Sequence, residues 1–339
     1  MNKNIVLAFA CLSLSLAAPL AVFSAPYGEF LISPPQAPQS FQALAQKVSF
    51  HSSGDVKRAL NYYGGPVISH VKVFVVFWGI GVDSQIQLNI GPFYQNILDS
   101  GYMDGLAQYA TNVSAIDGRA GTGQTIGRGR LLGETTITPK NQNTNLSDEM
   151  IQKELEFQIS SGALPPADAD TLYMIYLPAG FQVSLPDSSH SCWGEKALLG
   201  YHEGFKSQAG NSIFYGVIPD CTASFREVSA VSSHEMVEAV TDPFPTLGNS
   251  PSYPQAWNSA SGFEVADLCD SIAPLSHVSG SNAESTVEPW WDNLTGACAK
   301  GPWSQARARA NLPLSIGRGH SWDSLRQAGR FTPSRWDGL

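Results

Sequence analysis

Three apolar segments constrain the fold of this chain more than any other feature. Residues 67–78, 171–180 and 212–221 are dense in aliphatic and aromatic residues. Runs of this length and composition are typical of buried strands. A helical pattern lies between the first two, with apolar residues at 151, 155 and 159. Strands that alternate with helices predict a mixed sheet of the α/β or α+β class in a single main domain.

Other segments complete this expected sheet and its helices. Residues 125–139 alternate in polarity and contain several glycines, which is typical of an exposed or edge strand. Residues 145–162 predict a helix with Ser147 as its N-cap. A further helix is expected from about Arg226 to just before Pro243, because proline cannot continue a helix.

The two ends of the chain differ from this central region. Residues 1–25 combine Lys3 with an apolar run and small residues, so we expect a secretory signal peptide rather than a membrane span. Residues 26–60 are rich in Pro, Ser and Gln and predict an extended N-terminal arm or pro-segment. Residues 61–300 are the expected main domain, and residues 301–339 form an Arg-containing tail. No later stretch is apolar enough to cross a bilayer, so the expected location is extracellular, periplasmic or in the cell wall.

Charge and cysteine usage narrow the class further. The net charge of −9 argues against a nucleic-acid partner. Outside the expected signal peptide the cysteines are Cys192, Cys221, Cys269 and Cys298. An even number in an exported chain predicts two disulfides, and we favour Cys192 with Cys221 and Cys269 with Cys298 because short loops close most readily. A four-cysteine zinc site is the alternative, but no CxxC pair is present.

The expected helix before Pro243 carries the residues with the clearest chemistry. His234 and Glu238 stand one turn apart on the same face, and both can point at one ion. Apolar residues occupy most of the circumference, so the polar stripe of Glu227, His234, Glu238 and Thr241 must face a cleft or a set of partners. Zn²⁺ would satisfy a buried imidazole and carboxylate. Glu235 would lie beside that ion, where a general base is needed.

A downstream segment, GFEVADLCD, supplies further acids. Glu264 follows Glu238 by 26 residues, and Asp267 comes three residues later. Together the two segments resemble those of the gluzincin metallopeptidases. The resemblance implies a zincin-like sheet with an active-site helix, zinc bound by His234, Glu238 and Glu264, and Asp267 hydrogen-bonded to the other nitrogen of His234, which fixes its tautomer.

A second resemblance concerns the same motifs. The segments SSHEMVEAVTDP and EVADLC resemble paired segments of the EXORDIUM, or phosphate-induced, protein family. YYGGPVISHVKVFVVFWG and SCWGEKALLGYHEGF also resemble parts of that family. The match covers roughly residues 60 to 300 in separate islands and implies an extracellular or cell-wall protein. Plant members have Asn where this chain has Asp242, which makes Asp242 a rival to Glu264 as ligand.

The sequence leaves three functional hypotheses. The first is a secreted zinc-dependent hydrolase acting on a peptide or protein, in which Glu235 activates water and His202 assists by stabilising an oxyanion. The second is a non-catalytic binding or signalling protein of the extracellular space or cell wall that keeps the metal for structure. The third is a carbohydrate-active enzyme with Glu235 and Glu264 as its paired acids.

Overall fold

A computed structural model describes residues 59–186, 190–192, 197–221, 224–245, 250–270, 272–280 and 284–305. The expected signal peptide, almost all of the expected N-terminal arm and most of the expected C-terminal tail lie outside the described residues. The described residues form one main domain of mixed α/β structure, as predicted. Among these residues, no helix combines the length and the apolar character needed to span a membrane.

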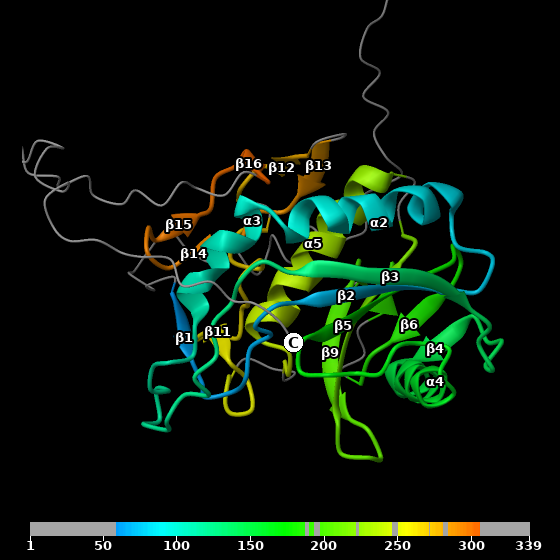
Figure 1. Ribbon diagram of the computed structural model, residues 1–339, viewed down its shortest axis with the longest axis horizontal. Helices are drawn as coiled ribbons and strands as arrows, with labels where there is room; N and C mark the ends of the chain where they lie inside the picture. Colours follow the sequence, from blue (N-terminus) through cyan, green and yellow to red (C-terminus); the bar gives the residue numbers. More distant parts are fainter. Residues whose placement is uncertain are drawn as a thin grey trace, which may run out of the picture. The chain divides into compact units, whose positions relative to one another are not determined.

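A five-stranded sheet forms the centre of the domain (Figure 1). Its strands are β2 (Lys72–Trp78), β3 (Arg130–Ile137), β5 (Thr171–Leu177), β9 (Tyr201–Lys206) and β10 (Ser212–Pro219). They are ordered β3–β2–β5–β10–β9; the first four are mutually parallel, and β9 runs antiparallel to β10 at one edge. The opposite edge is β3, which confirms the edge strand predicted within residues 125–139.

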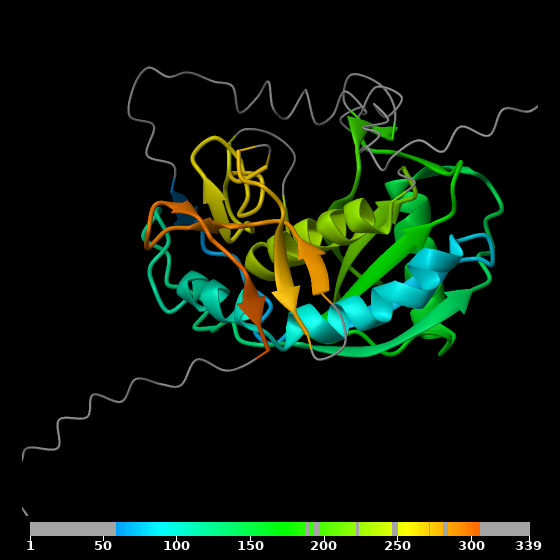
Figure 2. The same ribbon diagram turned by 90° about the horizontal axis from the view of Figure 1, so that it is seen from above.

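Helices cover both faces of this sheet. They are α2 (Ser84–Leu98), α4 (Asp148–Ser160) and α5 (Phe225–Thr241). Alternate residues of each strand enter separate cores: Val75 and Met174 pack with α2 and α5, whereas Val76 and Ile175 pack with α4. Figure 2 shows α2 and α5 on the same side of the sheet. Ser147 caps α4 by accepting a hydrogen bond from the Met150 amide, as expected.

The first predicted strand is shorter than its apolar run. It begins at Lys72 rather than Val67, although Val67 is buried. The Ile68 amide donates to the carbonyl of Val240, and the Ser69 amide donates to the carboxylate of Asp170. Because these amides are bonded to the end of α5 and to a loop, the segment is buried without joining the sheet.

Several short strands pack against the C-terminal half of α5 and against α2. Strands β1 (Leu60–Tyr62) and β11 (Trp257–Ser259) pair with each other. A second group contains β12 (Ser276–Ser279), β13 (Glu284–Val287) and β16 (Trp303–Ser304), and a third contains β14 (Trp291–Asp292) and β15 (Ala297–Cys298). The short helices α3 (Gly101–Asp104) and η1 (Gly105–Tyr109) lie beside these C-terminal strands. The chain after α5 therefore returns to that helix and places its loops against it.

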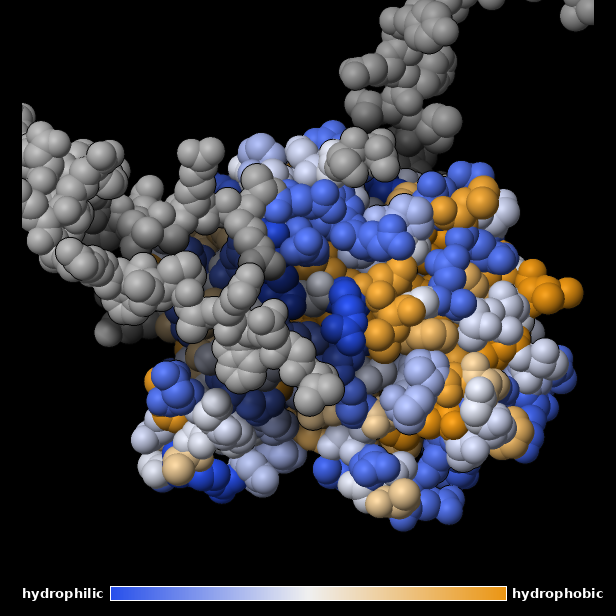
Figure 3. Space-filling view, viewed as in Figure 1, coloured by the Kyte–Doolittle hydropathy of each residue, from blue (hydrophilic) through white to orange (hydrophobic). Residues whose placement is uncertain are grey.

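Another small sheet flanks α4. It consists of β4 (Asn145–Ser147), β6 (Gln182–Ser184), β7 (His190–Ser191) and β8 (Ala197–Leu198). Figure 3 shows hydrophobic side chains gathered on the half of the viewed face where Figure 1 places β6 and α4. Apolar side chains are therefore concentrated on this part of the viewed face.

Two disulfides join segments that follow one another along the chain. Cys192 is bonded to Cys221, and Cys269 to Cys298, each across a separation of 29 residues. Both pairings agree with the short-loop expectation. The first connects β7 to the end of β10, just before α5, and the second connects the segment around residue 267 to β15.

Candidate metal centre

Helix α5 presents His234 and Glu238 to the same side. Glu238 Oε2 lies 3.1 Å from His234 Nε2, as expected for residues one turn apart. Most other residues of α5 are buried, and the helix ends at Thr241, with Asp242 as its C-cap directly before Pro243. The polar pair is therefore held on a helix that the core fixes in place.

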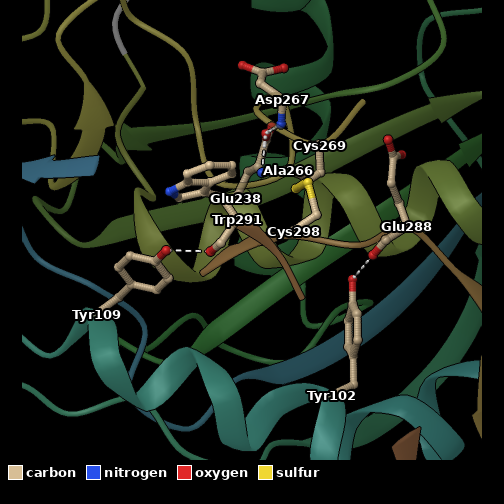
Figure 4. Close-up of a disulfide and its surroundings, with 9 residues drawn as sticks. All are labelled: Tyr102, Tyr109, Glu238, Ala266, Asp267, Cys269, Glu288, Trp291 and Cys298. Atoms are coloured by element: carbon tan, nitrogen blue, oxygen red, sulfur yellow. Dashed lines mark hydrogen bonds between the residues drawn. A yellow bond between two sulfur atoms is a disulfide. The ribbon is translucent and has the colours of Figure 1, made fainter. Parts of the chain in front are cut away.

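The segment 264–270 closes over Glu238 as a tight turn. The backbone amides of Ala266 and Asp267 donate to Glu238 Oε1 at 3.2 and 3.0 Å (Figure 4). Asp267 Oδ2 accepts from the amide of Glu264 at 3.0 Å, while its Oδ1 lies 3.7 Å from His234 Nε2. One oxygen of each carboxylate is thus held by backbone, and the other is directed at the His234 imidazole.

Glu288 holds the opposite side of that imidazole. Its Oε2 lies 3.1 Å from His234 Nδ1. Its amide donates to Ser233 Oγ at 2.9 Å, and its carbonyl accepts from Tyr102 Oη at 2.8 Å. We expected Asp267 to fix the tautomer of His234, but Glu288 occupies the position for that role, and Asp267 lies at Nε2 instead. The cause is the bond from the Glu264 amide, which orients the Asp267 carboxylate toward α5.

Substitution of Glu288 tests this arrangement. In Glu288→Gln, we expect the affinity for Zn²⁺ to fall by about 10- to 100-fold, because the second ring nitrogen of a metal-binding histidine loses its charged acceptor. Isothermal titration of the metal-free protein measures the change. Glu284→Gln is the control, since Glu284 is exposed on the neighbouring strand β13. Equal affinities in wild type and Glu288→Gln would contradict the assigned role.

His202 enters the site from the edge strand β9. Its Nε2 lies 3.1 Å from the carbonyl oxygen of Asp242 and 3.4 Å from Glu264 Oε1. Gly204 permits this approach, because a Cβ there would lie only 2.3 Å from the carbonyl oxygen of Pro243. The predicted auxiliary histidine is therefore next to the motif helix, and its side chain is buried among acceptors.

Glu235 lies on the other side of the His202 ring. Its Oε2 is 3.3 Å from His202 Nδ1, and the same nitrogen is 3.9 Å from Glu238 Oε2. Gly200 leaves room for this carboxylate, since a Cβ at that position would come within 2.8 Å of Glu235 Oε1. The expected general base is thus buried beside the same His202 nitrogen that Glu238 approaches.

Asp242, the rival ligand, has a different role. Its carboxylate accepts from the amide of Ala256 at 2.8 Å and from the side-chain amide of Asn258. The residue caps the C-terminal end of α5, where its own amide donates to the Glu238 carbonyl. These bonds attach the end of the helix to the segment that enters β11.

The described residues contain two groups that could hold a metal ion, and they share Glu238. One is His234, Glu238 and Asp267; the other is His202, Glu238 and Glu264. Within each group one ligand atom per residue lies within 4.8 Å of the others. The set expected from sequence, His234, Glu238 and Glu264, is divided between them. Asp267 replaces Glu264 beside His234.

The first group fits a small divalent metal ion by its donors and spacing. Zinc ligands lie about 2.0–2.2 Å from the ion, which puts tetrahedral ligand atoms roughly 3.3–3.6 Å apart. The distances from His234 Nε2 to Glu238 and Asp267 are 3.1 and 3.7 Å. One imidazole and two carboxylates are ordinary ligands for Zn²⁺, and Mn²⁺ accepts the same donors.

Uncompensated negative charge dominates the electrostatics of the site. Burial raises the pKa of Glu238 and that of Asp242 to about 7, and it raises the pKa of Glu264 well above its usual range. Burial alone would lower the pKa of His202, but the carboxylates of Glu264 and Glu235 outweigh it and raise that pKa well above its ordinary value. Without a metal, the site therefore favours protonation.

The disulfide between Cys269 and Cys298 supports the two loops that carry Asp267 and Glu288 to His234. Cys269 follows Asp267 by two residues, and Cys298 pairs with Trp291, three residues after Glu288. Figure 4 shows the bond between these loops, with Tyr109 donating to the Trp291 carbonyl nearby. One covalent link thus holds together the two segments that face His234 from outside α5.

Loss of this link should affect stability and metal binding together. We expect Cys269→Ser with Cys298→Ser to lower the free energy of unfolding by about 2–4 kcal/mol and to weaken Zn²⁺ binding. Chemical denaturation and metal titration measure the two effects. The double variant of Cys192 and Cys221 is the matched control, because its loop has the same length; we expect a similar loss of stability with unchanged metal affinity. Equal metal affinity in both double variants would refute the link to the site.

Glu288 is the site residue that sequence reasoning missed. It lies 50 residues after Glu238 and just before Trp290 and Trp291, and no spacing relates it to the motif helix. The comparisons add no further information about the site: no protein-family model, curated protein or solved structure matches the chain.

Proposed function

We propose that this protein is a secreted metal-dependent hydrolase that cleaves peptides or proteins. The proposal rests on the contacts of His234: its Nε2 faces the carboxylates of Glu238 and Asp267, while Glu288 holds its Nδ1. A neutral histidine that donates through one nitrogen presents a lone pair at the other, as a metal ligand must. We infer zinc as the ion and His234, Glu238 and Asp267 as the residues that would hold it.

The residues of the chain divide the chemistry between them. A divalent ion bound in this group would supply Lewis acidity and lower the pKa of a water molecule. Glu235 Oε2 would accept the proton of that water; its carboxylate is buried 3.3 Å from His202 Nδ1. Two carboxylates with one imidazole offset the charge of the ion, so we expect slower turnover or a higher pH optimum than for a site with two histidines.

The position of β9 supports an extended peptide as substrate. This strand is an edge of the central sheet and carries His202. Within the described sheet, β9 has a partner strand on only one side. A peptide that pairs with a sheet edge exposes its carbonyl groups in regular order, so a chain bound along β9 would pass the site. The two disulfides suit an oxidising compartment, which supports secretion.

A second candidate function is a non-catalytic extracellular binding or signalling protein with a structural metal. Low exposure favours it: the side chains of Glu238, His234 and Asp267 are 4, 14 and 21 % exposed. A closed site suits a structural ion better than one that must admit a substrate. Resemblance to the EXORDIUM family is in line with this candidate, with a cell-wall component as partner.

Metal content and peptide cleavage distinguish the two functions. We expect the purified protein to contain tightly bound zinc and to cleave members of a fluorogenic peptide library. Chelation should abolish cleavage, and added Zn²⁺ should restore it. Bound metal without cleavage of any peptide would favour the structural role. Protein that neither retains nor takes up metal would refute both.

A further inference from the structure

We propose that a second divalent cation binds next to the first, held by His202, Glu238 and Glu264, with Glu238 shared between the two ions. The inference rests on the proposed function, because the first ion is the one held by His234, Glu238 and Asp267. It adds a neighbouring site and makes the centre binuclear.

The orientation of His202 defines which nitrogen is available. Its Nε2 lies 3.1 Å from the carbonyl oxygen of Asp242, which can only accept a hydrogen bond. With the proton on Nε2, the lone pair is on Nδ1, in the arrangement typical of metal-binding histidines. That nitrogen is 3.3 Å from Glu235 Oε2 and 3.9 Å from Glu238 Oε2, and this Glu238 oxygen is 3.1 Å from His234 Nε2. A single carboxylate oxygen thus faces both imidazoles, as a bridging ligand does.

Glu264 supplies an independent observation. Its Oε1 is buried and has no hydrogen-bond partner, although the atom lies only 3.4 Å from His202 Nε2. If Nε2 donates to the Asp242 carbonyl, no proton remains for Glu264 Oε1. A buried carboxylate oxygen without a partner is costly, and coordination to a cation removes that cost. The three side chains of this second group already have ligand atoms within 4.8 Å of one another.

Charge gives a third reason for two ions. Five carboxylates surround the two imidazoles, from Glu235, Glu238, Glu264, Asp267 and Glu288. Among the described residues, the ion pairs of these acids involve His202 and His234 and no lysine or arginine. One divalent cation offsets two of the five charges, and two cations offset four. Paired ions about 3.5–4 Å apart are common in hydrolytic sites, and carboxylate-rich donors accept Zn²⁺ or Mn²⁺.

Metal stoichiometry tests the second site directly. The full-length secreted protein is stripped with a chelator, loaded with Zn²⁺ and, separately, Mn²⁺, and assayed for ions per chain by mass spectrometry. We expect two ions in wild type and one in Glu264→Gln or His202→Gln. Asp267→Asn should also retain one, because it removes only the first site. Glu227→Gln is the control, since Glu227 is exposed on the same helix and should leave two ions bound.

A spectroscopic readout separates adjacent ions from distant ones. The electron paramagnetic resonance spectrum of wild type with two Mn²⁺ should show exchange coupling, which Glu264→Gln should abolish. Circular dichroism and thermal melting confirm that each variant is folded, and unfolded variants are replaced by the milder Glu264→Asp. Coupled spectra in wild type with a loss of one ion in the variants support the proposal.

The number of bound ions separates the second site from the proposed function. One ion in wild type, retained in Glu264→Gln and lost in Asp267→Asn, would overturn the second site and leave the proposed function intact. Two uncoupled ions that Glu264→Gln does not change would overturn it as well, because the second ion would lie elsewhere. No bound ion in wild type would overturn the second site and the proposed function together.

Discussion

Replacing Glu235 with glutamine should reduce peptide cleavage by about 10²- to 10⁴-fold without releasing the metal. The Gln side chain has almost the same shape and fits the space that Gly200 leaves, but its amide cannot accept a proton from water at neutral pH. His202 Nδ1 keeps a neighbour at the same position, so the geometry of the site should persist. The loss should therefore appear in kcat rather than in metal content.

The matched control for this prediction is Glu227→Gln, on an exposed turn of the same helix. Initial rates on one fluorogenic peptide, measured beside metal analysis of the same samples, give the comparison. If Glu235→Gln cleaves as fast as wild type, Glu235 is not the base. If wild type and variant bind metal equally and neither cleaves any peptide, the structural function is the better account.

Replacing Glu238 with glutamine should have the largest effect on metal binding, about 100-fold or more. Glu238 Oε2 is the oxygen nearest His234 Nε2, and an amide is a much poorer ligand than a carboxylate. The backbone amides of Ala266 and Asp267 can still donate to the Gln carbonyl, so the turn should remain closed. Zn²⁺ titration of the metal-free variant measures the loss.

The same substitution should stabilise the metal-free protein at alkaline pH. Burial raises the pKa of Glu238 to about 7, above its value in the unfolded chain. The stabilisation from the protonated form is therefore complete below about pH 4 and is lost as pH rises through 7. Gln does not ionise. At pH 8 in chelator we therefore expect the free energy of unfolding of Glu238→Gln to exceed that of wild type by about 1–3 kcal/mol. With saturating Zn²⁺, wild type should become the more stable of the two.

This reversal is specific to a metal ligand. Asp242 has a pKa raised to a similar value, but its carboxylate is bonded to Ala256 and Asn258. Asp242→Asn should therefore change stability by the same amount with and without Zn²⁺. A Glu238→Gln variant that is less stable than wild type in chelator at pH 8 would contradict the charge account.

Local patterns were sufficient to predict the framework of the site. A helix that is apolar around most of its circumference must be buried, and the four-residue spacing then brings His234 and Glu238 together. The two cysteine pairs could be predicted because each pair closes a short loop of the chain. The alternating glycine-rich segment predicted β3 at a sheet edge, since such strands lack the apolar residues that a central strand buries.

Tertiary contacts decided what the sequence could not. Glu264 and Asp267 lie on one turn. The hydrogen bond from the Glu264 amide to Asp267 Oδ2 decides that Asp267, and not Glu264, faces His234. Glu288 follows strand β13, which is distant from the motif helix in sequence but packs against it in the fold. The approach of His202 depends on the absence of a side chain at Gly204. This requirement cannot be recognised until β9 is known to lie beside the end of α5.

Anomalous diffraction at the zinc absorption edge, from crystals of the zinc-loaded protein, tests directly whether His234, Glu238 and Asp267 hold the ion. We expect a peak about 2.0–2.2 Å from His234 Nε2 and from carboxylate oxygens of Glu238 and Asp267, with Glu288 still at His234 Nδ1. An occupied second site would add a peak beside His202 and Glu264. A map with no peak at His234 Nε2, or with the imidazole turned so that Nδ1 meets the ion, would contradict this ligand assignment.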